Sequence, residues 1–169
     1  VELPLAEAGR AVASLITRSE AASLHLEHLR RRAWDLEPAT RERLFAGALL
    51  PAPWIATARQ VRRRFAEEAA RAFRRHDVLL APATPCAAPA SEQTWIELDG
   101  QRLPLRENLG LLTSPLSCIG LPVCTVPVWG AHPRLPIGVQ LVAAPWCEDR
   151  VLRVAGELER AGLCYAPIA

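Results

Sequence analysis

The sequence contains no lysine and no methionine, and all 20 of its basic residues are arginines. The chain therefore offers no amine base, no Schiff-base lysine and no lysine for a phosphate-binding loop. It also lacks a Gly-rich phosphate loop. Chemistry of these kinds would need residues from outside the chain. Because the chain starts at Val1 and contains no methionine, we expect that Val1 is not the translation start.

Long apolar runs and paired cysteines are also missing. No apolar run approaches the ~20 residues that cross a bilayer, and no basic segment followed by an apolar stretch marks a secretory signal. The five cysteines lack paired short spacings, which is typical of reduced cytosolic thiols and not of disulfides or a zinc site. The formal charge of +2 is too small to indicate a polyanionic partner. We expect a cytoplasmic protein that binds neither nucleic acid nor a membrane.

Apolar spacing predicts helices in the first part of the chain. Residues 4–48 read as helical, with Pro38 in the first turn of a short helix that ends near Gly47. A longer helix follows Pro53, and its arginines fall largely outside its apolar stripe. That basic side could bind nucleic acid or a membrane, but no aromatic residue apart from Trp54 is left for base stacking, so a solvated face is favoured. The stripe consists of Trp54, Ala58, Val61, Phe65, Ala69 and Ala72.

The second part of the chain predicts strands. They are residues 78–81, 94–98, 101–105, 123–128 and 137–142. The first is a short apolar run that suits a buried strand, and the prolines after it exclude regular structure. Asp99-Gly100 between the next two strands predicts a hairpin with a tight turn. A closing helix has Glu148 in its first turn and stops at Gly162.

The order of these elements predicts an α/β fold in which helices pack on a mixed β-sheet. No internal repeat and no linker divides the chain, so residues 1–169 are taken as one partial domain. So few strands would leave sheet edges without a partner. We therefore expect the rest of the fold to lie outside this chain.

The densest group of hydroxyl and thiol side chains lies in the predicted loop from Thr113 to Pro122, which includes Ser117 and Cys118. A serine or cysteine nucleophile needs a base within hydrogen-bond reach. No histidine has a sequence context that places it there, so a structural loop is the favoured interpretation. The histidines are His25, His28, His76 and His132.

Two other residue pairs suggest a metal site or acid–base catalysis, but neither pair predicts one. His25 and His28 lie three apart on a predicted helix, but no third ligand accompanies them, and a metal site is not predicted. Glu148 and Asp149 could act as an acid and a base. Their position in a first helical turn already accounts for them, because the helix dipole stabilises negative charge there.

Four stretches, in order, resemble the C-terminal region of the amidase signature family. They are Arg43–Gly47 (Arg-x-x-x-Gly), Asp77–Pro89 (beginning DVLLAPATP), Thr113–Pro127 (TSPLSCIGLP, then TVP) and Pro136–Glu159 (beginning PIGVQLV). The resemblance implies an amide hydrolase without a cofactor, in which a lysine takes a proton through the bridging serine of a Ser–cis-Ser–Lys triad. A glycine-rich loop would form the oxyanion hole. No residue of this chain matches these groups, so the chain alone would be inactive and would supply one wall of the substrate pocket.

The resemblance also indicates substrate-binding positions, namely Arg43, Asn108, Thr113 and Ser117. In the related glutaminyl-tRNA amidotransferase A subunits, the arginine that matches Arg43 holds a substrate carboxylate, which a planar guanidinium suits. A plain surface arginine is the alternative. Those subunits have an aspartate where this chain has Gly110 and an asparagine where it has Ser117, and both departures argue against a glutamine-handling subunit.

Residues 108–113 and 143–149 look most like the 1-carboxybiuret hydrolase branch of this family. In that branch a small carboxylated urea is cleaved, and the amidase is accompanied by a small helical accessory subunit. The resemblance therefore implies a small amide substrate, such a partner, the missing N-terminal part of the fold and an oligomeric whole enzyme. The alternative is a non-catalytic scaffold module of a multi-subunit amidase or amidotransferase. An upstream lysine followed by Gly-Gly-Ser-Ser-Gly-Gly would favour the enzyme.

Overall fold

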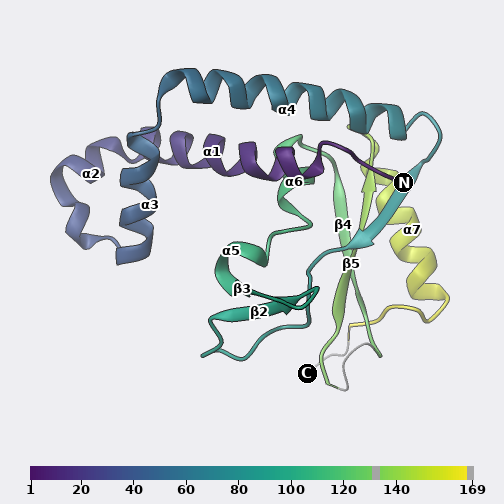
Figure 1. Ribbon diagram of the computed structural model, residues 1–169. Helices are drawn as coiled ribbons and strands as arrows, with labels where there is room; N and C mark the ends of the chain where they lie inside the picture. Colours follow the sequence, from purple (N-terminus) through teal and green to yellow (C-terminus); the bar gives the residue numbers. More distant parts are fainter. Residues whose placement is uncertain (131–133, 167–169) are drawn as a thin grey trace.

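The computed structural model describes residues 1–130 and 134–166, which form a helical part and a sheet part (Figure 1). The helices of the first part are α1 (Ala6–Leu24), α2 (Leu26–Arg32), the 3-10 helix η1 (Ala33–Asp35), α3 (Pro38–Ala48) and α4 (Ala52–Ala72). The later elements are β1 (Val78–Pro82), β2 (Trp95–Leu98), β3 (Gln101–Pro104), α5 (Leu105–Asn108), α6 (Ser114–Cys118), β4 (Val123–Val128), β5 (Ile137–Ala143) and α7 (Glu148–Arg160). The predicted α/β class is confirmed.

The long helices α1 and α4 lie side by side because each presents an apolar stripe to the other (Figure 1). Val12 and Ile16 of α1 form a buried cluster with Ala58 of α4. Phe65 is fully buried and its ring approaches Gly9 so closely that a Cβ on Gly9 would lie 2.7 Å from a ring carbon. Trp54, the one aromatic residue of α4 that the prediction left outside the buried set, is 58% exposed in the first turn of the helix.

Helix α3 begins at Pro38 because Glu37 caps it. The Glu37 carboxylate accepts hydrogen bonds from the backbone N–H groups of Ala39 and Thr40, at 3.1 and 2.9 Å. The bond from Ala39 is the main cause that lowers the pKa of Glu37, and the positive charge of Arg106 contributes a smaller effect. The Glu37 carboxylate thus fixes where α3 starts.

The sheet has the order β1-β5-β4, and every strand pair that the structure describes is antiparallel. The central strand β5 buries Leu141 against α7, where Leu141 forms a cluster with Val126, Val151 and Cys164. Because side chains alternate along a strand, Gln140 and Val142 face the opposite side of the sheet. The chain thus covers one face with α7 (Figure 1), while Gln140 on the other face donates a hydrogen bond to the carbonyl of Leu112.

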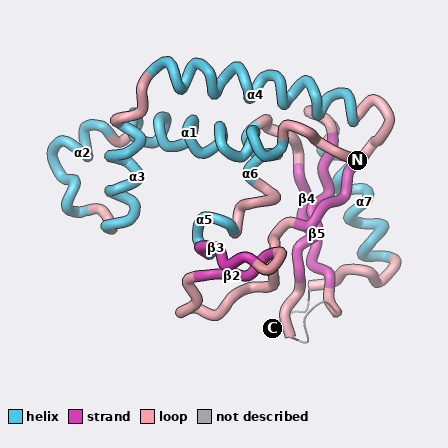
Figure 2. Tube along the Cα trace, viewed as in Figure 1, coloured by secondary structure: helices cyan, strands magenta, loops and turns pink. Residues whose placement is uncertain are grey.

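The hairpin is confirmed: β2 pairs with β3, and both residues of the Asp99-Gly100 turn have positive φ, at 50° and 74°. The absence of regular structure after β1 is confirmed as well, since an irregular stretch joins β1 to β2 (Figure 2).

Two predictions about the strand region were wrong. Among the described residues, strand β1 is an edge strand and not a buried one, because it pairs there with β5 alone, and Leu80 is 59% exposed. The predicted loop from Thr113 to Pro122 contains the short helix α6. Pro115 lies in the first turn of α6, where its missing N–H has no intrahelical partner to lose.

We predict opposite effects for two glycine substitutions. Gly47→Ala would place a Cβ on the backbone carbonyl of Arg18, so it should force α3 from α1 and lower the free energy of unfolding by about 1–3 kcal/mol. Gly156→Ala in α7 is the matched control, since its Cβ would meet only the Arg160 guanidinium at 3.9 Å. It should raise that free energy by about 0.5–1 kcal/mol. Urea unfolding followed by circular dichroism measures both, and a stabilising Gly47→Ala would contradict the close helix contact.

Candidate functional site

Three of the four predicted substrate-binding residues lie in one segment between the hairpin and β4. This wall segment (residues 105–118) contains α5 and α6. Asn108 ends α5, Thr113 precedes α6 and Ser117 lies within it, where the Ser117 N–H donates to the Thr113 carbonyl at 3.0 Å. Arg43 stands apart: it is exposed on α3, which packs against α1, α2 and η1. The structure thus brings three predicted residues together and leaves the fourth on a separate helix.

Asn108 joins the wall segment to α1. Its side chain is 7% exposed, and Nδ2 donates to the carbonyl of Pro104 at 2.8 Å. Arg10 donates from Nη2 to Oδ1 of Asn108 at 2.7 Å and to the carbonyl of Glu107 at 3.2 Å. Both the oxygen and the nitrogen of the Asn108 side-chain amide therefore form hydrogen bonds within the protein. A contact of Asn108 with a substrate stays a prediction.

Gln140 joins the same segment to the sheet, and sequence reasoning did not single it out. Its side chain is 1% exposed. Nε2 donates to the carbonyl of Pro82, at the end of β1, at 2.8 Å and to the carbonyl of Leu112 at 3.1 Å. The sequence did contain one indication of this role, a glutamine in the middle of an apolar strand, because a buried amide has to find hydrogen-bond partners.

Thr113 and Ser117 offer hydroxyl groups on the wall segment. Thr113 is half-buried, whereas Ser117 is exposed. Gly110 lies one turn before Ser114, and a Cβ at Gly110 would come within 2.8 Å of the Ser114 hydroxyl oxygen. A side chain at position 110 would therefore require the Ser114 hydroxyl to turn aside.

Within the described residues, no hydrogen bond connects Ser117 or Cys118 to a histidine; His132 lies outside them. Burial raises the pKa of the Cys118 thiol, an effect that Arg62 partly offsets, so the thiol stays protonated at neutral pH. No group of three His, Cys, Asp or Glu side chains in the described ranges could hold a metal ion. The described residues of the wall segment offer hydroxyl groups but no activated nucleophile.

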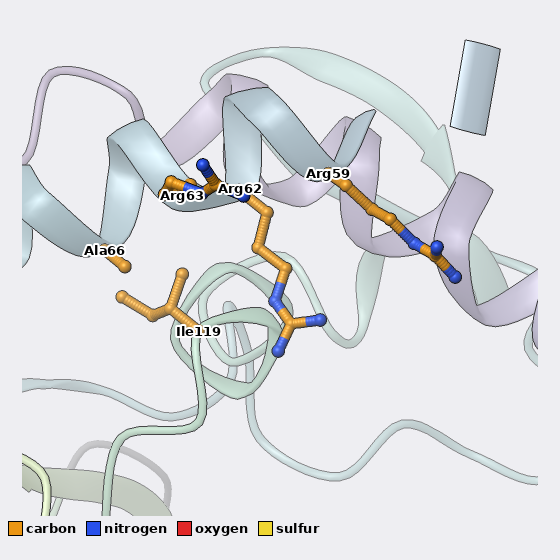
Figure 3. Close-up of a pocket in the computed structure, with 5 residues that line it drawn as sticks. All are labelled: Arg59, Arg62, Arg63, Ala66 and Ile119. Carbon is orange, nitrogen blue, oxygen red and sulfur yellow. The ribbon is translucent and has the colours of Figure 1, made fainter. Parts of the chain in front are cut away.

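A basic groove of about 340 Å³ lies between α4 and the end of α6. Figure 3 shows Arg62 reaching towards the coil that carries Ile119, while Arg59 extends away from that coil and across α1. Arg59 lies 3.9 Å from Glu20, and both side chains are more than half exposed, so this pair adds at most about 1 kcal/mol. The groove contains no group that could act as a nucleophile or a base. It is lined by Arg59, Arg62, Arg63, Ala66 and Ile119.

In the described ranges, the helices are too short or too polar to cross a bilayer.

Comparisons with known sequences agree with the predicted resemblance. A family model described as amidase matches residues 4–152. The AtzE subunit of 1-carboxybiuret hydrolase from Pseudomonas sp. (strain ADP) is 46% identical over 161 residues, which are 95% of this chain and 35% of that protein. A glutamyl-tRNA(Gln) amidotransferase subunit of Zymomonas mobilis is 39% identical over 112 residues, which are 65% of this chain and 22% of that protein. The chain thus spans about a third or less of these relatives.

Solved structures agree as well. One is described as a vestigial protein complex that reveals the evolutionary origins of an s-triazine catabolic enzyme. Its matching chain has a TM-score of 0.95 and 44% identity, over 99% of this chain and 37% of that chain. A crystal structure of an amidase has a TM-score of 0.90 and 33% identity, over 95% of this chain and 37% of that one. The resemblance predicted from the four sequence stretches is confirmed.

We predict that two wall-segment residues differ in their effect on stability. Asn108→Ala should lower the free energy of unfolding by about 1–3 kcal/mol, because the Pro104 carbonyl loses its side-chain donor and Arg10 keeps only the Glu107 carbonyl. Ser117→Ala, at an exposed position, should change it by less than about 0.5 kcal/mol. Chemical denaturation of both variants checks this, and equal effects would show that Asn108 does not anchor the segment.

Proposed function

Because this chain belongs to the amidase family, we propose that the whole protein hydrolyses a C–N amide bond of a small carboxylated urea or amide, such as 1-carboxybiuret. The observation that carries the proposal is the 46% identity to a 1-carboxybiuret hydrolase subunit over 95% of the chain. The match to an amidase crystal structure at a TM-score of 0.90 supports the reaction class.

The proposal divides the chemistry between this chain and the rest of the protein. The chain is a C-terminal portion of the amidase and forms part of its single catalytic domain. It has no lysine, so the Ser–cis-Ser–Lys triad and the oxyanion-hole loop belong to the other portion. The wall segment closes one side of the pocket. Thr113 and Ser117 donate hydrogen bonds to the substrate there.

The substrate is proposed to be acidic because Arg43 supplies a guanidinium fork for a carboxylate. Arg43 has no ion pair among the described residues, so its charge is free for a ligand. Glutamine is disfavoured, because Gly110 and Ser117 replace two residues that the glutamine-handling subunits use.

The whole enzyme is proposed to work in the cytoplasm as an oligomer with a small helical accessory subunit. Two comparisons support a partner: the 46% identical relative is named as a subunit, and the matching solved structure is a protein complex.

Turnover assays of the whole protein on 1-carboxybiuret, aryl amides and glutamine test the substrate. We expect 1-carboxybiuret to have the highest kcat/KM of the three. Turnover restricted to bulky aryl amides would contradict a carboxylated substrate. No turnover of any amide would favour the scaffold module.

Arg43→Ala in the whole protein should raise KM for a carboxylated substrate by about 10- to 100-fold and leave kcat nearly unchanged, because it removes a charged hydrogen-bonding partner of the bound substrate. KM for an uncharged amide should stay the same. Arg30→Ala, at another exposed arginine of the helical part, is the matched control and should change neither constant. An unchanged KM for the carboxylated substrate would remove Arg43 from the pocket.

A further inference from the structure

The wall segment is held in place partly by hydrogen bonds to its backbone carbonyls. Within the segment the bonds are local, such as those from the Leu111 N–H to the Asn108 carbonyl at 3.1 Å and from the Ser114 N–H to the Gly110 carbonyl at 2.9 Å. Such bonds shape the turn between α5 and α6 but do not set its distance from the sheet. Gln140 sets that distance, because its Nε2, on the central strand, donates a hydrogen bond to the Leu112 carbonyl.

The same nitrogen donates to Pro82, so one amide group connects three parts of the chain. They are β5, the end of β1 and the residue directly before Thr113. Gln140 is 1% exposed, so water cannot replace it as a donor without opening the structure.

We infer that Gln140 is a positioning residue, which fixes the turn carrying Thr113 and Ser117 against the sheet and thereby sets the affinity of the pocket for its substrate. The effect on affinity rests on the proposed function. The effect on the order of the wall segment does not.

The chemistry of the contact explains why a glutamine is needed. Two carbonyl oxygens converge on one group, so that group has to provide two N–H donors from one atom. A hydrocarbon side chain provides none. A carboxylate of the same length directs lone pairs at both carbonyls, whereas its protonated form donates one hydrogen bond.

The Gln140→Glu variant should therefore make the contact with the two carbonyl oxygens dependent on pH. Burial and the two carbonyl oxygens favour the neutral form of the introduced carboxyl group, so it should titrate above the usual range of a carboxyl. At low pH the group donates one of the two bonds. At high pH it is ionised and repels both oxygens.

The test uses the whole protein with Gln140→Met, Gln140→Glu and a control, Val151→Ala. Val151 is 3% exposed beneath α7, so its truncation weakens the core on the other face of the sheet. KM and kcat are measured on the amide substrate between about pH 5.5 and 8.5, a range that spans the expected titration. Hydrogen exchange of the Leu111, Ser114 and Ser117 amides is followed by mass spectrometry at the same pH values.

Gln140→Met should raise KM about tenfold over the unchanged protein at every pH, with a smaller change in kcat. The reason is that the Leu112 carbonyl, next to Thr113, loses its hydrogen-bond donor. Gln140→Glu should approach the unchanged protein at the acidic end and the Gln140→Met variant at the alkaline end. The exchange rates of the three amides should follow the same pattern. Val151→Ala should lower the unfolding temperature and leave both KM and these exchange rates unchanged.

Two outcomes would overturn the inference. Either Val151→Ala changes KM and exchange as Gln140→Met does, which would make the effect one of global stability, or Gln140→Glu keeps a constant ratio to the unchanged protein across the pH range. If the whole protein turns over no amide, the proposed function fails, and the exchange pattern alone decides whether Gln140 positions the segment.

Discussion

The fold of this chain depends on how closely other elements approach α1. The end of α3 reaches it at Gly47, where a Cβ would overlap the Arg18 carbonyl, and Phe65 of α4 reaches it at Gly9. Helix α6 packs against it as well, and Arg10 extends from it to Asn108. One helix therefore determines the relative positions of the helical part and the wall segment. Small residues permit these approaches because a larger side chain would separate the backbones.

Local patterns were sufficient to predict most elements, and their failures have a common cause. The apolar stripe predicted α4, and the Asp99-Gly100 turn predicted the hairpin, because both signals arise within a few residues. The burial of β1 could not be predicted, since it depends on whether a second strand pairs with its outer edge. The apolar run at 78–81 is equally compatible with a central strand and with an edge strand.

The candidate site was only partly accessible from the sequence. Family resemblance pointed to the wall segment, and the structure explains how that segment is held. The anchors are side chains from other elements, Arg10 and Gln140, whose contacts no periodicity encodes. Gln140 had a signal, a polar residue in an apolar strand, yet the signal does not say which carbonyls the amide meets. A sequence without lysine cannot supply the family's base, so the reacting groups stay expected outside this chain.

The anchors of the wall segment are also far apart along the chain. Arg10 and Asn108 are separated by 98 positions, and Gln140 lies 58 positions from Pro82 and 28 from Leu112. Long-range contacts form only after the intervening chain has lost its loop entropy, so they come late in folding. Regions that depend on such contacts also open at a lower free energy than the core. Loss of either of these side-chain anchors would therefore loosen the wall segment well before the protein unfolds.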